Sequence, residues 1–287
     1  MNAINRLLQS IEKRYRRFFN ARFYKLTPQQ TPMGFKLTGN ESMEKGLFEP
    51  TETFLVGKLL DQVDTFVNVG ANIGYYCCFA LLKNKPTIAF EPEPQNLKFL
   101  LKNIKANKWA DRIEIYPVAI SNKVGIVDIY GGTSGSSTGA SLLPGWANTP
   151  SDLVDIVPAS TLDFVIGGRL AGLKTLVLMD IEGAELFALQ GASKLIKQTP
   201  KPIWIIEICV RDHQPKNISI NPNLFATFSL FWENGYEAYT ATPKPRIITK
   251  EELASIASSG ENTTGVHNFI FAERQLADGM FNFNGEM

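Results

Sequence analysis

Short apolar runs alternate with amphipathic segments of helix length from about residue 65 onward, and this rhythm limits the folds open to the chain. The apolar runs stand at 65–69, 87–90, 176–179 and 203–206, each too short to be an ordinary helix. Between two of them, Leu97, Leu100, Leu101 and Ile104 follow one another at helical spacing. Strands buried on both faces read as continuous apolar runs, and their alternation with helices is typical of a parallel sheet covered on both faces. The sequence therefore predicts an α/β fold.

Other segments extend this prediction. We expect helices over about 73–83, 184–197 and 223–234, and further strands over 113–120, 236–241 and 266–273. Alternating apolar and polar residues at 125–130 and about 154–158 predict a β-hairpin inserted in the domain. Apolar residues within 4–19 recur on one helical face, which predicts an N-terminal helical extension.

We expect three parts in the chain of 287 residues. Residues 1–53 hold the basic amphipathic helix and a linker over 26–53, which is rich in proline and glycine. Residues 54–275 form the α/β domain, and residues 276–287 form a tail. Hydrophobic residues make up 44% of the chain and charged residues 20%, a balance typical of a globular protein with a core of useful size.

The net charge of +1 conceals an uneven distribution. Residues 1–25 hold seven basic residues and one acid, a charge of +6, and the other 22 basic and 27 acidic residues give −5. The overall balance argues against a uniformly basic protein that binds nucleic acid. We expect the helix at 4–19 either to pack on the domain with its basic face in solvent or to lie on anionic lipid.

The sequence contains no run close to the roughly 18 apolar residues of a membrane span, and no secretory signal is visible. Its three cysteines, Cys77, Cys78 and Cys209, match neither a disulfide framework nor a zinc motif. We therefore expect a cytoplasmic protein, with peripheral contact at the inner face of the membrane if the basic helix binds lipid.

Polar residues follow the apolar runs at the points where the strands are expected to end. The run at 65–69 leads to Asn68 and the turn Gly70-Ala71-Asn72-Ile73-Gly74, and the run at 87–90 leads to Glu91. The run at 176–179 leads to Asp180 and Glu182, and the run at 203–206 leads to Glu207, with His213 six residues on. Ligands of open parallel sheets bind at the carboxyl ends of the strands, whereas a helix cap is the other common use of such residues. We interpret these positions as a binding site.

The glycine turn does not match the GxGxxG fingerprint of dinucleotide-binding proteins, which disfavours an NAD-dependent dehydrogenase. Glycine still allows the backbone to approach a ligand closely. Glu91 lies 21 residues after Gly70, where a carboxylate could accept hydrogen bonds from both hydroxyls of a ribose. The constellation favours a ligand that contains a nucleoside.

Five segments resemble successive motifs of the FkbM-family methyltransferases, in order and spacing, across roughly 64–273. They are Asn68-Val-Gly-Ala-Asn-Ile-Gly74, Phe90-Glu-Pro-Glu-Pro-Gln-Asn96, Thr161-Leu-Asp163, Met179-Asp-Ile-Glu-Gly-Ala-Glu185 and Leu189-Gln-Gly-Ala192. The resemblance implies an S-adenosylmethionine-dependent methyltransferase with a Rossmann-like, mostly parallel seven-stranded sheet whose last strand is antiparallel. Members commonly methylate hydroxyl oxygens of sugars, glycans or secondary metabolites.

The resemblance also implies roles for the residues at the strand ends. The methionine part of the cofactor would face Asn68 and the turn residues Gly70, Ala71, Asn72 and Gly74. Glu91 would hold the ribose, and Val118 and Ala119 would flank the adenine. Asp180 and Glu182 would lie beside the transferred methyl and the acceptor. The family usually has Asp where this chain has Asn68, so the charge that would pair with the cofactor's ammonium group is missing. A module that binds S-adenosylmethionine without catalysis is therefore the competing class.

Methyl transfer to oxygen needs aligned reactants and a group that accepts the hydroxyl proton. A carboxylate crowded by other carboxylates has a raised pKa and becomes a better base, so we expect Asp180 or Glu182 to be the base. Glu207 and His213 would shape the pocket of a small-molecule or glycan acceptor. Asp180, Glu182 and Glu207 offer the hard oxygen ligands that Mg²⁺ takes, but their spacing matches no metal loop, and we expect no metal.

Overall fold

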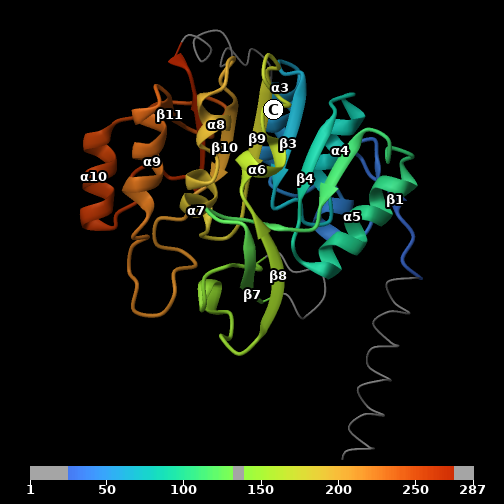
Figure 1. Ribbon diagram of the computed structural model, residues 1–287, viewed down its shortest axis with the longest axis horizontal. Coiled ribbons are helices and arrows are strands. Elements are labelled where there is room, and N and C mark those ends of the chain that lie inside the picture. The colour runs from blue at the N-terminus through green and yellow to red at the C-terminus, as the bar shows by residue number, and fades with distance from the viewer. Residues whose placement is uncertain (1–24, 132–138, 275–287) are drawn as a thin grey trace, which may run out of the picture.

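The computed structural model describes residues 25–131 and 139–274 and has a twisted sheet of eight strands at its centre (Figure 1). The strand order is β12-β11-β13-β10-β9-β3-β4-β5. These strands are β3 (Thr65–Val69), β4 (Thr87–Phe90), β5 (Ile113–Tyr116), β9 (Thr175–Met179), β10 (Ile203–Glu207), β11 (Glu237–Thr240), β12 (Ile247–Ile248) and β13 (Asn268–Ala272).

The direction of the strands follows the expected pattern. β5, β4, β3, β9 and β10 pair in parallel, whereas β13 lies between β10 and β11 and is antiparallel to both. Strand β12 adds two residues at the edge. Without β12, the sheet has seven strands of which the last in the chain is antiparallel, as predicted.

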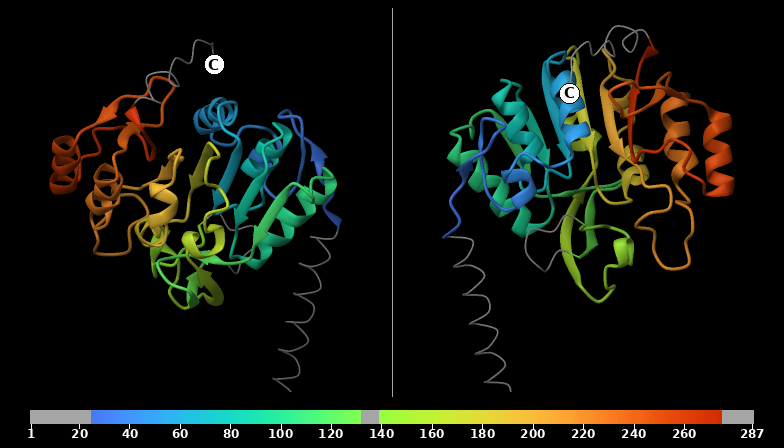
Figure 2. Two further views of the ribbon diagram at one scale, coloured as in Figure 1. Left: turned by 45° about the horizontal axis from the view of Figure 1, so that its top comes forward. Right: turned by 180° about the vertical axis from the view of Figure 1, so that it is seen from behind.

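Helices cover both faces of this sheet (Figures 1 and 2). One face carries α3 (Pro50–Leu60), α4 (Tyr75–Leu82) and α5 (Pro94–Ala106), and the other carries α6 (Leu162–Ile166), α7 (Glu185–Gln190), α8 (Ser193–Lys197), α9 (Leu224–Glu233) and α10 (Lys250–Ser259). Alternate residues of a strand pack into the two cores, one on each face of the sheet. In β10, Ile203 and Ile205 pack with the first group of helices, and Trp204 and Ile206 pack with the second. This burial on both faces explains the continuous apolar runs.

The predicted strand over 113–120 is in fact two strands that belong to different sheets. β5 joins the central sheet, and β6 (Ala119–Ile120) pairs with β8 (Val154–Ser160), which also pairs with β7 (Gly125–Tyr130). Pro117 lies between β5 and β6 and has no N–H to donate to a ladder, so pairing stops there. The expected hairpin is therefore part of a three-stranded sheet, which projects beyond the end of the central sheet in Figure 1.

The predicted helix over 184–197 is likewise divided, into α7 and α8. A side chain at Gly191 would bring its Cβ to 2.3 Å from the carbonyl oxygen of Ser121, so the chain passes too close to its neighbour for any residue but glycine. The helix ends at this contact, and α8 begins two residues later.

The residues expected to form a linker pack against the sheet. They contain β1 (Gln29–Gln30), β2 (Lys36–Leu37), α2 (Glu41–Glu44) and the start of α3. The prolines and glycines mark turns, but Phe35, Leu37 and Met43 between them are buried in the core beneath α3, α4 and α5. The predicted helix at 4–19 and the predicted tail at 276–287 lie outside the described residues.

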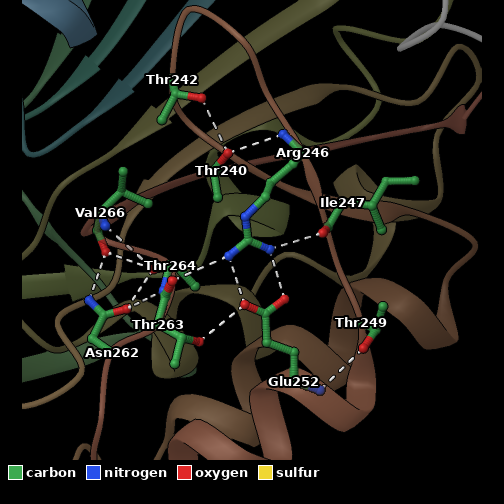
Figure 3. A network of polar contacts seen from close by, with 10 residues as sticks. All are labelled: Thr240, Thr242, Arg246, Ile247, Thr249, Glu252, Asn262, Thr263, Thr264 and Val266. Carbon is green, nitrogen blue, oxygen red and sulfur yellow. Dashed lines mark hydrogen bonds and ion pairs between the residues drawn. The ribbon is translucent and has the colours of Figure 1, made fainter.

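The segment between β11 and β13 is fixed by a polar network (Figure 3). The guanidinium of Arg246 donates to both carboxylate oxygens of Glu252 at 2.8 and 2.7 Å, and Thr249 caps α10 by accepting from the Glu252 backbone N–H. This contact joins β12 to α10 and has a structural role. None of the helices within 25–131 and 139–274 is long and apolar enough to cross a membrane.

Candidate active site

A first cavity opens at the carboxyl ends of β3, β4 and β9. Seven of the predicted site residues line it: Gly70, Asn72, Glu91, Val118, Ala119, Asp180 and Glu182. Ile129, Ala140 and Leu142 complete the apolar part of the wall. These last residues come from the β7–β8 insertion, and no motif in the sequence pointed to them.

A second cavity adjoins the first on the side of α3. The predicted residues Asn68, Ala71 and Glu207 line it, and Gly70, Asn72 and Asp180 border both cavities. Glu49, Glu52 and Asn268 also line it and were not predicted. They come from the start of α3 and from β13, far from the motifs in the sequence. The two cavities form one site with its junction at the ends of β3 and β9.

Gly70 permits this junction because it has no side chain. Its φ is +86°, and a Cβ there would lie 1.9 Å from the carbonyl oxygen of Asp180. The backbone N–H groups of Gly70 and Ala71 both donate to the Phe90 carbonyl, which fixes the turn to the end of β4. The predicted site residue Gly74 lines neither cavity, because its missing Cβ makes room for Leu100 of α5.

Glu91 is held by backbone donors at the floor of the first cavity. Its side chain accepts from the N–H groups of Asn72, at 2.6 Å, and Glu93, at 2.9 Å. Burial raises the pKa of Glu91 to about 7, and these two backbone hydrogen bonds act in the opposite direction. The Asn96 side chain also hydrogen-bonds to this carboxylate, and because a carboxylate has about four acceptor sites, one remains open for a hydroxyl.

Asp180 and Glu207 lie on the same face of the sheet. They follow Leu178 of β9 and Ile205 of β10 by two residues each, and those two residues are paired in the ladder and pack on the α3 side. The pKa of Asp180 lies well above its usual value, mainly because of burial and then because of the charges of Glu207 and Glu182. Asp180 therefore binds a proton more readily than a free carboxyl group does.

Glu182 joins the β7–β8 insertion to the central sheet. Its carboxylate accepts from the indole N–H of Trp146 at 2.6 Å, and its backbone carbonyl accepts from the Ser141 hydroxyl at 2.6 Å. Trp146 is only 2% exposed and covers Gly183, where a Cβ would lie 2.6 Å from the indole ring. Burial raises the pKa of Glu182, and the hydrogen bond from Trp146 lowers it.

His213 lies beside Glu182 but borders neither cavity. Its Nδ1 is 3.6 Å from the Glu182 carboxylate, its ring meets Trp146 edge to face, and its side chain is 48% exposed. The structure thus brings Asp180, Glu182 and Glu207 together and leaves His213 on their solvent side. Within the described ranges, no group of three or more His, Cys, Asp or Glu side chains is arranged to hold a metal ion.

The lining fits a nucleoside joined to an amino acid. The first cavity combines a buried carboxylate, Glu91, with apolar walls at Val118, Ala119 and Ile129. Gly70 borders both cavities, and the second cavity is lined by carboxylates and by the Asn68 side chain. The Asn68 Oδ1 atom is buried and has no hydrogen-bond partner among the described residues. Such an arrangement suits S-adenosylmethionine, which carries a nucleoside and an ammonium group.

The sheet, with its antiparallel last strand and a site at the carboxyl ends of the parallel strands, is that of the Rossmann-like S-adenosylmethionine-dependent methyltransferases. Residues 68–238 match the family model described as the methyltransferase FkbM domain, which is more than half of the chain. The chain belongs to the FkbM methyltransferase family, as predicted, and its cofactor is S-adenosylmethionine.

Solved methyltransferases show a distant likeness to the chain. An FkbM methyltransferase from Methylobacillus flagellatus is 19% identical with a TM-score of 0.43, over 73% of this chain and 43% of that chain. An O-methyltransferase from Bacillus cereus, in complex with SAH, is 12% identical with a TM-score of 0.43, over 78% and 80%. A SAM-dependent O-methyltransferase from Thermotoga maritima is 10% identical with a TM-score of 0.40, over 81% and 70%.

The aligned region is therefore less than half of the Methylobacillus protein. No curated protein sequence matches the chain.

Proposed function

We propose that the protein transfers a methyl group from S-adenosylmethionine to a hydroxyl oxygen of a saccharide, glycan or other hydroxylated small molecule. The observation that carries this proposal is the position of Asp180, which borders both cavities and has a raised pKa because of burial and neighbouring acids. The bound cofactor supplies an electrophilic methyl carbon on a sulfonium. The chain itself must then align the acceptor and remove its proton.

Three groups of residues are proposed to hold the cofactor. Glu91 accepts from the ribose hydroxyls, and Val118 and Ala119 flank the adenine in the first cavity. The turn that begins at Gly70 brings backbone close to the amino-acid part. A carboxylate that is already held by two backbone N–H groups loses little further freedom when it binds a ligand.

Asp180 is proposed to accept the hydroxyl proton. A base works best when its pKa lies near the operating pH, and burial among acids moves the pKa of Asp180 upward from that of a free carboxyl group. Glu182 would orient the acceptor next to Asp180. His213, half exposed on the far side of Glu182, would pass the proton to solvent.

Mass spectrometry of products tests this proposal. The purified protein is incubated with S-adenosylmethionine and with saccharide and metabolite fractions, and products are searched for the added mass of one CH₂ group. With the product identified, we expect Asp180→Asn to lower turnover by about 10²- to 10⁴-fold while binding of S-adenosylhomocysteine persists.

Glu261→Gln is the matched control, because it removes an exposed acid outside both cavities. Full turnover by Asp180→Asn would contradict the proposed base, and full turnover by Glu182→Gln would contradict the proposed role of Glu182 in orienting the acceptor. Cofactor binding by the native chain without transfer to any fraction would favour the competing class, the non-catalytic binding module.

A further inference from the structure

The second cavity carries an excess of negative charge. Its lining includes four carboxylates, those of Glu49, Glu52, Asp180 and Glu207. Among the described residues that line it, no Lys, Arg or His is present. Burial, and after it the charges of neighbouring carboxylates, raise the pKa values of Glu49 and Asp180. A cationic group bound in this cavity would reduce the repulsion between its carboxylates.

Asn68 adds an acceptor that no described residue satisfies. Its side chain is 2% exposed and borders the second cavity, and its Oδ1 atom has no hydrogen-bond partner among the described residues. The Nδ2 group of the same side chain donates to the Gly70 carbonyl at 3.4 Å, so Oδ1 is the atom left for a ligand. Buried acceptors without a donor are rare in native proteins, and a bound ligand is one of the ordinary reasons for them.

Glu49 is held in place at the N-cap of α3. Its φ of +40° is in the left-handed region, and its Oε2 atom accepts from the Tyr76 hydroxyl at 2.8 Å. Burial raises the pKa of Glu49 to about 7, with the charge of Glu207 as a further cause. A cation beside this carboxylate would favour its ionised form.

The two cavities share Gly70, Asn72 and Asp180 in their linings, so a long ligand that passes these residues would enter both. For a ligand whose ribose lies at Glu91, the residues shared by both cavities lead from the nucleoside toward the second cavity. A primary ammonium donates three hydrogen bonds and carries the charge that the cavity lacks.

We propose that Glu49 and Asn68 together bind the α-ammonium group of the cofactor, with Glu49 providing the charge and Asn68 the neutral acceptor. This inference rests on the proposed cofactor site. Glu49 lies outside the residues 68–238 that match the family model, so α3 and the segment before it take part in cofactor recognition.

Calorimetry with two cofactor analogues tests the proposal. S-adenosylhomocysteine has the amino-acid end, and 5′-deoxy-5′-methylthioadenosine has the same nucleoside without it. We expect Glu49→Gln to raise the Kd of S-adenosylhomocysteine by roughly tenfold or more, the effect of losing a hydrogen bond to a charged group, and to leave the Kd of methylthioadenosine unchanged. Glu41→Gln, an exposed acid of α2, is the control and should change neither.

A rescue variant separates recognition from a merely structural role. Because Asn68→Asp returns a carboxylate to the position of the unsatisfied oxygen, we expect it to restore the preference of Glu49→Gln for S-adenosylhomocysteine. An equal loss of both ligands in Glu49→Gln, or an unchanged ratio of the two Kd values, would overturn the inference. If Glu49→Gln leaves the ratio of the two Kd values unchanged but raises the KM for the acceptor, the second cavity binds an ammonium group of the acceptor. That outcome would also overturn the inference.

The native chain distinguishes this inference from the proposed function. If it binds neither analogue, the proposed cofactor site fails and the inference fails with it. If it binds both analogues and Glu49→Gln leaves their ratio unchanged, only the role of Glu49 and Asn68 is rejected.

Discussion

Gly70 determines how closely two strand ends approach, and the site depends on that approach. Its neighbour across the junction is the carbonyl oxygen of Asp180, which leaves no room for a methyl group. The left-handed φ at this position adds a second restriction that favours glycine.

Substitution of Gly70 by alanine is therefore expected to disturb both folding and binding. The added Cβ must displace the end of β3 or β9, and the strained φ alone costs about 1–3 kcal/mol of unfolding free energy. We expect a lower midpoint in denaturant and a loss of S-adenosylhomocysteine binding in calorimetry. Gly168→Ala is the control, since a Cβ there meets nothing within 4 Å, and it should behave as the native chain.

Several polar residues of the candidate site could be predicted because they follow buried strands, but their surroundings could not. Glu91, Asp180 and Glu207 border the cavities because each directly follows a buried strand. Glu49 could not be predicted as a site residue, because the glycine and proline residues near it are typical of a linker. His213 follows Glu207 closely in sequence, and in the structure its half-exposed ring lies beside Glu182 and borders neither cavity.

The segment from Ser141 to Trp146 connects the three-stranded sheet to the end of β9. Both residues hydrogen-bond to Glu182, one through its backbone and one through its carboxylate. The insertion therefore forms a wall of the first cavity and also acts on a candidate catalytic acid.

Loss of the indole N–H should shift the pH dependence of the reaction. The hydrogen bond from Trp146 lowers the pKa of Glu182, so Trp146→Phe should raise that pKa. If Glu182 must be ionised, the acidic limb of the kcat/KM profile moves to higher pH, by up to about one unit for one hydrogen bond. A profile with an unmoved limb would show that ionisation of Glu182 does not control the rate.

Trp232→Phe serves as the comparison for this experiment. Trp232 lies on α9 and borders neither cavity, so its profile should match that of the native chain.

The elements of the central sheet could be predicted because each local pattern agrees with its environment. The runs at β3, β4, β9 and β10 are apolar since both faces are buried. The division of 113–120 depends on the pairing of β6 with β8, a contact between distant residues that local periodicity does not encode. Helices α3 and α10 were missed because α3 begins at a proline within an expected turn region and α10 is rich in small polar residues.

At the scale of the whole molecule, charge is divided between the first 25 residues, at +6, and the remainder, at −5. Acids from β4, β9, β10 and α3 gather at the site. Such a site suits a cationic cofactor and repels polyanions. Of the seven basic residues in the first segment, Lys25 is described and exposed, and the other six lie outside the described part of the chain.

We expect the full chain to bind vesicles that contain anionic lipid. Each basic residue near such a surface contributes about 1 kcal/mol, so replacing Arg14, Arg16 and Arg17 by glutamine should weaken binding roughly a hundredfold. Co-sedimentation measures the effect, and neutral vesicles are the control. Equal sedimentation of the native and substituted chains would exclude a membrane role for this segment.

Strand β13 is the last strand of the sheet to be synthesised, yet it lies between β10 and β11. Its first residue, Asn268, contacts Glu52 across 216 residues of sequence and lines the second cavity. A nascent chain therefore leaves the facing edges of β10 and β11 unpaired, and open to association with other strands, until residues 268–272 have left the ribosome. The cofactor site is completed in that same final step, so a truncated translation product would be both prone to aggregation and unable to be rescued by its own cofactor.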